Sequence, residues 1–486
     1  MDRRSTAGWL LAALGAAFLL AANMGRALDA PLERTAPPGF RCWDDFGVAV
    51  RLFRGDRAGA RAAFPSDFEA ARHEIDRLEL RPWQFWRTAD EAAFPGVRAL
   101  DAIRPLDDTG RGRLLAVLFR LRGGIAPRMP FWMAPLFALP ALVWIGWECA
   151  RARHGIAGAL FVLALASSAF VVDVLPLSYS AAGFYVAAVL LLVPWAVYAA
   201  AGSPSVRGLL VRAGLVGGAL GACVYCRTGV LLVLPGFLVA LAVAAARLPR
   251  TRRVTIVLAS AALLCGPPLW VRTRMGGHEI WITLWEGLGD FDRSKGHVWS
   301  DAAAKRMVRQ HGVDELRSQE AQDALREDVL RAVRSDPAWY GDILGRRLLA
   351  TLGQWKLWGR GMRPSTRPGE GAIDGYYGLA RPVDTFVLGS RTVEVPVPLL
   401  LAGPVLLGAL AVGARGGGRR AAMAGLVVML ALCAGTLAVP VLVSTAGAFE
   451  TETVALAWLL AWSFVVEAAA DARERRSASS RSTIRP

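Results

Sequence analysis

The chain has 486 residues, of which 54% are apolar, and its mean hydropathy is positive, at +0.37. This composition excludes most cytosolic enzymes, because a soluble fold of this size needs more polar surface. The formal net charge of +16 comes almost wholly from Arg, since Lys occurs only as Lys295, Lys305 and Lys356. The Arg residues lie between apolar segments along the chain and do not form one basic block. We therefore expect a lipid bilayer as partner and no nucleic acid.

Long apolar segments recur along the chain, and about ten of them approach the 20 residues that cross a hydrocarbon core. The predicted spans are 7–24, 130–147, 155–172, 181–202, 209–226, 230–246, 254–271, 395–414, 421–443 and 453–470. The last is the weakest prediction, because its apolar core, 454–466, lies between Glu452 and Glu467. A tilted or interfacial helix is the alternative there.

Basic residues in the short connections predict the orientation, because such loops resist translocation. An inside N-terminus places Arg3, Arg151, the Arg247 to Arg253 cluster and the Arg-rich tail in the cytoplasm. We therefore expect a multi-pass protein of the cell membrane with both termini cytoplasmic and its large loops extracytoplasmic. A cleaved signal peptide is the alternative for the first span, and its loss would keep the same sidedness.

These spans predict an all-α polytopic membrane protein with two helical extracytoplasmic segments. In chain order we expect a first transmembrane helix (1–25), an extracytoplasmic loop (26–129), a six-helix membrane block (130–271), an extracytoplasmic helical loop (272–394), three C-terminal membrane helices (395–470) and a basic cytoplasmic tail (471–486). In the second loop, residues 313–333 carry apolar side chains at helical spacing. Asp336 and Pro337 then end that helix and start another.

The first candidate site is the adjacent pair Asp44 and Asp45, which follows the first span. A short helical apolar run comes next and ends at Gly55. A carboxylate at the membrane surface could take the proton of an acceptor hydroxyl or amine. The alternative is structural, since Asp in front of an apolar helix is a common N-cap.

The second candidate set is basic and lies where later spans end. Arg227 follows the fifth span, and Arg272 and Arg274 follow the seventh. A guanidinium offers phosphate a fixed fork of donors and keeps its charge, so these residues could grip an anionic leaving group. The alternative is interfacial snorkelling towards lipid headgroups.

The third candidate set, His278, Glu279 and Trp281, lies in a stretch rich in Trp, Gly and acidic residues. Aromatic faces stack on sugar rings and carboxylates accept hydroxyl hydrogen bonds, which predicts substrate binding. Trp also belongs to interfacial belts, which is the alternative. Two neighbouring ligands without spaced partners predict no metal site, so no cofactor follows from the residues and a divalent metal ion stays open.

The remaining motifs give little information about function. Cys223 and Cys226 form a CxxC at a span end, where we expect packing and not redox or metal chemistry. The chain has no Walker A loop, no GxGxxG after a strand and no HExxH motif, so a soluble nucleotide enzyme is unsupported.

The layout resembles the GT-C class of integral-membrane glycosyltransferases, which includes protein mannosyltransferases and aminoarabinose transferases. The resemblance covers most of the chain and rests on one span, an external loop that opens with Asp44-Asp45, and paired short spans. It also rests on Ser178-Tyr179-Ser180, Gly217-Gly218-Ala219-Leu220-Gly221 before Arg227-Thr228-Gly229, Pro267-Pro268-Leu269-Trp270-Val271-Arg272, and Asp336-Pro337-Ala338-Trp339-Tyr340. One departure is Ala448-Phe449-Glu450-Thr451-Glu452, where many relatives carry an Arg-aromatic pair.

The resemblance implies a polyprenyl-phosphate sugar donor and a lipid, glycan or protein acceptor on the non-cytoplasmic face. It further implies that Asp44 or Asp45 is the catalytic base and that Arg227 contacts the donor phosphate. The alternative function is a membrane transporter or lipid-carrier flippase, or a non-catalytic cell-envelope assembly protein. Pro194 and Pro440 favour that alternative, because either could break a span, as transporters require.

Overall fold

The computed structural model describes residues 3–28, 41–55, 110–168, 171, 175, 182–201, 205–275, 280–291, 294–298, 300–314, 316, 318–353, 383–388, 391–443 and 454–482. Within these ranges the elements are helices, apart from one two-stranded hairpin. The bundle helices are α1 (Arg3–Leu28), α8 (Pro135–Arg151), α9 (Gly155–Ser167), α11 (Ala182–Ala200), α12 (Val206–Cys226), α13 (Leu234–Ala246), α14 (Arg250–Met275), α20 (Val397–Gly413), α21 (Gly416–Thr436) and α23 (Val454–Ser482). Short helical turns adjoin three of them: η3 (Met129–Trp132), η4 (Thr228–Val233) and the π-helical η5 (Val439–Val443).

Seven helical stretches among the described residues are long and apolar enough to cross a membrane. They are Gly8–Gly25, Met129–Arg151, Gly183–Ala200, Val206–Cys226, Thr228–Ala246, Arg250–Thr273 and Gly416–Val443. Two more apolar helices are shorter, Gly155–Ser167 and Ala402–Gly413. The predicted helical, multi-pass character and the lipid environment agree with these helices. The predicted number of ten spans does not follow from them alone.

Helix α11 lies inside the bundle, and its apolar stretch Gly183–Ala200 is wholly buried. A helix that is apolar on every side is stable only when other helices surround it, which explains its place. Neighbouring helices instead leave apolar side chains on the outside, including Phe18 at 77% and Val254 at 70% exposure. Such an apolar exterior is expected of a surface that faces lipid.

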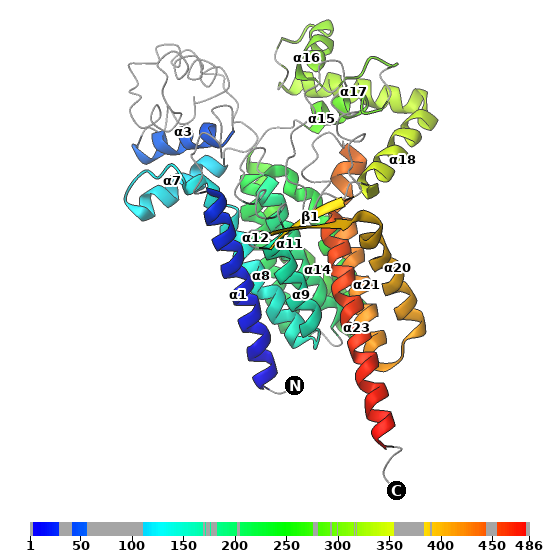
Figure 1. Ribbon diagram of the computed structural model, residues 1–486. Coiled ribbons are helices and arrows are strands. Elements are labelled where there is room, and N and C mark those ends of the chain that lie inside the picture. The colour runs from blue at the N-terminus through cyan, green and yellow to red at the C-terminus, as the bar shows by residue number, and fades with distance from the viewer. Residues whose placement is uncertain are drawn as a thin grey trace.

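The bundle has two distinct ends (Figure 1). The first residues of α1 and the last of α23 lie at one end, which we call the terminal end. Helices α3 (Arg41–Phe53), α7 (Gly110–Arg122), α15 (Ile280–Gly287), α16 (Asp301–Gln310), α17 (Gln319–Ser335) and α18 (Pro337–Gly353) lie at the other, which we call the loop end. The described helices of the two long segments between spans thus lie at the same end of the bundle.

The helices α15 to α17 enclose a small core of their own, built around Trp285, Leu325 and Val329. The single helix predicted over 313–333 is wrong at its start. Gly312 ends the preceding turn with φ +77°, and α17 begins only after Ser318, whose side chain accepts a hydrogen bond from the Ala321 amide. That N-cap is more stable than a continued helix, because a Ser oxygen satisfies an otherwise orphaned amide.

The predicted break at Asp336 and Pro337 is confirmed. Pro337 is the first residue of α18, and Asp336 Oδ1 accepts a hydrogen bond of 3.0 Å from the Trp339 amide. Pro suits a first helical position, because it lacks the amide hydrogen that would be unsatisfied there.

A buried ion pair joins α18 to the end of the bundle. Arg347 Nε lies 2.9 Å from Asp290 Oδ2, and both side chains are at most 1% exposed. Arg347 Nη1 also donates to the carbonyl oxygens of Val441 and Leu442 in η5. One guanidinium therefore ties together α18, the end of the α15 segment and the turn that follows α21.

The hairpin was not foreseen in a chain predicted to be all-α. Strands β1 (Val383–Leu388) and β2 (Arg391–Pro396) pair antiparallel, with Thr385 opposite Glu394, just before α20. Several of these positions hold Val or Thr, which favour extended backbone. Most of the hairpin falls in the segment 272–394, which was predicted to be helical, and only its last two residues fall in the predicted span that begins at 395.

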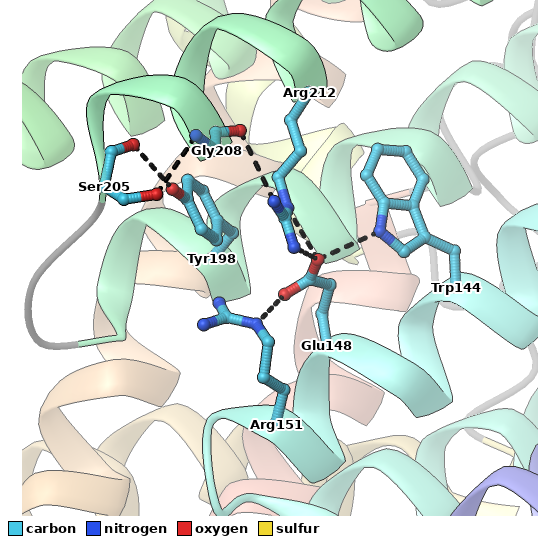
Figure 2. Close-up of polar contacts among 7 residues, drawn as sticks. All are labelled: Trp144, Glu148, Arg151, Tyr198, Ser205, Gly208 and Arg212. Carbon is cyan, nitrogen blue, oxygen red and sulfur yellow. Dashed lines mark hydrogen bonds and ion pairs between the residues drawn. The ribbon is translucent and has the colours of Figure 1, made fainter.

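Two carboxylates inside the bundle are buried, and both lie near the terminal end. Glu148, in the last turn of α8, is fully buried and binds Arg151 Nε at 2.6 Å and Arg212 Nε at 2.7 Å, as Figure 2 shows. Trp144 Nε1 donates to the same carboxylate. The two guanidinium groups also lie over the Tyr198 ring, at 4.9 and 4.2 Å from its centroid. This cluster (Trp144, Glu148, Arg151, Tyr198 and Arg212) fixes the ends of α8, α11 and α12 to one another.

The second buried carboxylate is Glu467 of α23, which directly follows the apolar core 454–466 of the last predicted span. Its Oε1 lies 2.9 Å from His154 Nδ1, and its Oε2 accepts a hydrogen bond from the Ala157 amide. It therefore caps the first turn of α9 from a distant helix, where a negative charge also complements the helix dipole.

Only the second of the two prolines that favoured a transporter coincides with a change in a helix, since α21 ends at Thr436, before Pro440. Pro194 lies inside the continuous α11, and Pro440 lies within the π-helical turn η5. A Pro in the first of these positions is tolerated because packed neighbours support the helix around it.

Helices α12 and α14 pack closely through glycine, which leads to a testable prediction. A methyl group on Gly217 would overlap the Leu263 carbonyl, whereas one on Gly218 would meet nothing within 4 Å. We expect Gly217→Ala to lower the free energy of unfolding by about 1–3 kcal/mol, as overpacking does. Gly218→Ala should leave it unchanged or raise it by up to about 1 kcal/mol, because Ala is the better helix former. Thermal unfolding in detergent measures both, and equal midpoints would contradict the packing.

Candidate functional site

The adjacent acidic residues lie inside a helix and not at its start. Helix α3 includes Arg41, so Asp44 and Asp45 are within its first turns, and the N-cap alternative is wrong for both. The helix ends at Phe53, and Gly55 follows with φ +89°, as the sequence predicted. This backbone conformation favours glycine, which terminates helices for that reason.

Helix α7 packs along α3 and supplies the partner of the acidic pair. Arg111 Nη2 lies 3.0 Å from Asp45 Oδ2, and the two side chains are only 4% and 13% exposed. About two turns further on, Arg120 Nη2 donates to the Leu52 carbonyl at 2.7 Å. The two pairs follow the same order in both helices, so α3 and α7 run parallel. The Arg111 contact therefore fixes the direction of the Asp45 carboxylate.

Close packing on both faces holds the start of α7 in place. A methyl group on Gly110 would overlap the Tyr225 carbonyl of α12, and one on Gly112 would lie 2.7 Å from Val48 Cγ1. Phe119 packs edge-on against Phe46, with ring centroids 5.6 Å apart. The start of α7, which carries Arg111, is therefore fixed against the loop end of α12. The point of contact is Tyr225, two residues before Arg227.

Arg227 is the C-cap residue of α12, and its amide donates to the Cys223 carbonyl at 2.8 Å. Arg272 lies near the end of α14, which packs against α12 in the same direction. Gly217 meets Leu263 and Gly221 meets Pro267, so the same offset brings Arg272 level with Cys226. Both Arg side chains are half-buried. Arg111, Arg227 and Arg272 thus lie at about the same height along the bundle, at its loop end. Asp45 forms an ion pair with Arg111.

Several predicted site residues lie outside what the structure describes. His278 and Glu279 are outside the described residues, and so are the side chains of Asp44 and Arg274. Their predicted roles therefore stay predictions.

Trp281 belongs to a different place, the core of α15 to α17. It packs against that core, and Arg326 lies over its ring at 5.8 Å. The neighbouring Trp339 is covered by Lys295 at 4.2 Å on one side and contacts His297. These aromatic contacts are within the protein, so a structural role accounts for Trp281 without a sugar.

Asp328 contributes a pH-dependent contact to this outer core. The contact with His297 Nε2, at 3.3 Å, lowers the pKa of the Asp328 carboxyl; partial burial opposes that shift, and the hydrogen bond from Trp285 Nε1 adds to it. A carboxyl whose pKa is lower in the folded state stabilises the fold above its unfolded value of about 4. That contribution is lost as the pH falls through the lower, folded value.

We therefore expect the amides of α17 to lose protection from hydrogen exchange between pH 6 and pH 3, after correction for intrinsic rates. Asp328→Asn should lower protection at pH 6 and flatten this dependence. Asp314→Asn, at a site 99% exposed, is the matched control and should change neither. An unchanged pH profile in Asp328→Asn would show that the contact does not stabilise α17.

Within the described residues, no group of three His, Cys, Asp or Glu side chains is placed to hold a metal ion. Cys223 and Cys226 are buried side chains of α12, in line with packing.

Sequence reasoning missed Arg111, which forms an ion pair with Asp45. The signal was faint, because Gly110-Arg111-Gly112-Arg113 is one of many Arg-rich stretches in this chain. The flanking glycines were the usable clue, since close helix packing needs them where the helix touches α12 and α3.

Comparisons with protein-family models, with curated proteins and with solved structures found no match.

Proposed function

We propose that this protein is a membrane glycosyltransferase of the GT-C type, which moves a sugar from a polyprenyl-phosphate carrier to a lipid, glycan or protein acceptor. One observation carries the proposal. Asp45 is held by Arg111 at the loop end of the bundle, against the end of α12 that bears Arg227. A carboxylate and cationic groups near the ends of spans are what transfer from a lipid phosphate requires.

The chemistry assigns a task to each group. The Asp45 carboxylate takes the proton of the acceptor hydroxyl or amine, and the acceptor atom forms a bond to the anomeric carbon. The bond from that carbon to the phosphate oxygen breaks, and its electron pair leaves with the polyprenyl phosphate. A single displacement inverts the anomeric configuration. Arg227 and Arg272 neutralise the departing phosphate, and preorganised charge of this kind is worth several kcal/mol of barrier.

Asp45 is preferred over Asp44 as the base for a physical reason. A base must be held in one direction, and the Arg111 contact at 3.0 Å holds the Asp45 carboxylate in place. Arg274, His278 and Glu279 follow Arg272 in the chain and are proposed to line the same end of the bundle as substrate contacts.

The proposal includes ten membrane crossings, with both termini in the cytoplasm. Helices α9, α20 and the first half of α23 would then cross despite their shorter apolar length, helped by packing against longer neighbours. The cationic residues at the terminal end support this sidedness, since Arg151, Arg212, Arg247 and Arg253 all lie there, in or beside short connections. The loop end would face the extracytoplasmic side, where a nucleotide sugar is absent and a lipid-carried sugar is the available donor.

A transporter would use charged groups in the middle of the membrane. The buried carboxylates Glu148 and Glu467 lie instead near the terminal end, where each is bound by a cationic or imidazole partner within 3 Å. Such fixed pairs support a structural role for these carboxylates, and the enzyme is therefore the function we favour.

The test is the envelope chemistry of cells that lack the gene. Mass spectrometry of lipids, glycans and envelope proteins should reveal one product that is lighter by a single sugar and is restored by the wild-type gene. Purified protein in liposomes should then transfer that sugar from polyprenyl-phosphate sugar extracted from the same cells. Unchanged envelope products, together with uptake or flipping of a solute in the liposomes, would favour transport and overturn the proposal.

A further inference from the structure

Helix α7 has an outward face that mixes apolar and basic side chains. Val117 and Leu121 are 46% and 80% exposed, and Arg113 and Arg122 are exposed beside them. Residues 113, 117 and 121 are four apart, so they form one stripe along the helix. The other face is the packed one, where Leu115 and Phe119 are fully buried and Phe119 contacts Phe46 of α3. A free apolar stripe of this kind is unusual on a helix that faces only water.

The place of α7 explains the stripe. Its first turn is held against Tyr225 at the end of α12, and its remainder projects sideways past α1 (Figure 1). In this view α3 lies on the side of α7 that is farther from the spans. The face opposite α3 is therefore directed towards the level where the spans end. Helix α1, which lies beside α7 in this view, exposes apolar side chains such as Phe18, as a lipid-facing helix does.

We propose that α7 is seated in the surface of the bilayer leaflet at the loop end and binds anionic phospholipid there. Val117 and Leu121 enter the boundary between headgroups and acyl chains, and Arg113 and Arg122 bind lipid phosphates. A helix face that exposes aliphatic side chains with Arg beside them has this preference, because Arg reaches the lipid phosphates while the aliphatic side chains stay in the apolar boundary.

A lipid surface fits this face better than a protein partner. The stripe continues an apolar exterior that already faces lipid, whereas a second copy of the chain would bring the same Arg residues against one another. Like charges at such short range oppose association. Lipid phosphate supplies the opposite charge at the depth where the Arg side chains lie.

This inference goes beyond the proposed function and does not depend on it, but it has a consequence for the site. The helix that lies on the leaflet also carries Arg111, the partner of Asp45. Lipid binding along the outer half of α7 therefore helps to set the position of the ion pair at its start.

Photocrosslinking in nanodiscs tests the proposal on the full chain. The photoreactive amino acid p-benzoylphenylalanine is introduced at position 121, in nanodiscs of equal parts phosphatidylglycerol and phosphatidylcholine. Position 18 of α1 is the control for lipid contact, and position 327 of α17, where the Glu side chain is 72% exposed, is the control for water. We expect lipid adducts by mass spectrometry at 121 and 18, and none at 327.

The charge is tested in the same sample. Phosphatidylglycerol should be enriched about fivefold over phosphatidylcholine in the adducts at 121, since each Arg near a surface favours anionic lipid by about that factor. The double variant Arg113→Gln, Arg122→Gln should return the adducts to the composition of the disc. No lipid adduct at 121, an adduct with a second copy of the chain, or adducts without enrichment would each overturn the proposal. None of these readouts requires sugar transfer, so they are independent of the proposed enzyme activity.

Discussion

Replacing Asp45 by Asn is expected to slow sugar transfer by about 10²–10⁴-fold, the range that a general base contributes. The amide keeps the shape of the side chain but cannot accept the proton of the acceptor. Donor binding should change little, because the proposed phosphate contacts are Arg227 and Arg272. The measurement is the initial rate of sugar release from the lipid carrier in liposomes, with the amount of inserted protein determined in parallel.

Matched variants separate the role of Asp45 from that of its neighbours. Asp44→Asn changes the adjacent carboxylate in the same helix and should have the smaller effect. Arg111→Lys should keep more activity than Arg111→Gln, because it keeps a positive charge near Asp45. Full activity in the double variant Asp44→Asn, Asp45→Asn, with normal insertion, would refute the assignment of the base.

Glu148→Gln is expected to lower the free energy of unfolding by about 3 kcal/mol, the lower part of the range for a buried ion pair that loses one partner. Glu148 is fully buried, whereas its partners are partly open to solvent, at 38% for Arg151 and 20% for Arg212. The variant leaves two guanidinium groups without their carboxylate beside the Tyr198 ring (Figure 2). Partial hydration of these groups keeps the loss from being larger.

The same substitution at an exposed pair provides the control. Glu327 binds Arg331 at 2.9 Å on α17, but these side chains are 72% and 58% exposed. Surface ion pairs of this kind contribute about 0–1 kcal/mol, so Glu327→Gln should hardly move the unfolding midpoint. Equal shifts for the two variants in thermal unfolding would contradict the structural role of Glu148.

The seven long apolar helices of the bundle could be predicted from the sequence, because hydrophobicity is a local property. An apolar run of 18 or more residues needs lipid or a protein interior wherever it lies in the fold. The break at Asp336 and Pro337 and the end of α3 before Gly55 were predicted for the same reason, since a proline or a glycine acts on its own backbone. The start of α17 was misjudged because apolar spacing was weighted above the cap that Ser318 provides.

The sequence by itself determined that this is a chain of apolar helices with two polar segments, and that acidic and basic residues lie near the ends of its spans. Only the tertiary structure decided which of these charges meet. Asp45 pairs with Arg111, Glu148 with Arg212 at a separation of 64 residues, and Glu467 with His154 at 313. Pairing of this kind depends on which helix faces pack together, and glycines such as Gly110 permit that packing through contacts with distant backbone. No local pattern records the identity of that distant neighbour, so the ion pair on which the proposed chemistry rests became visible only in the fold.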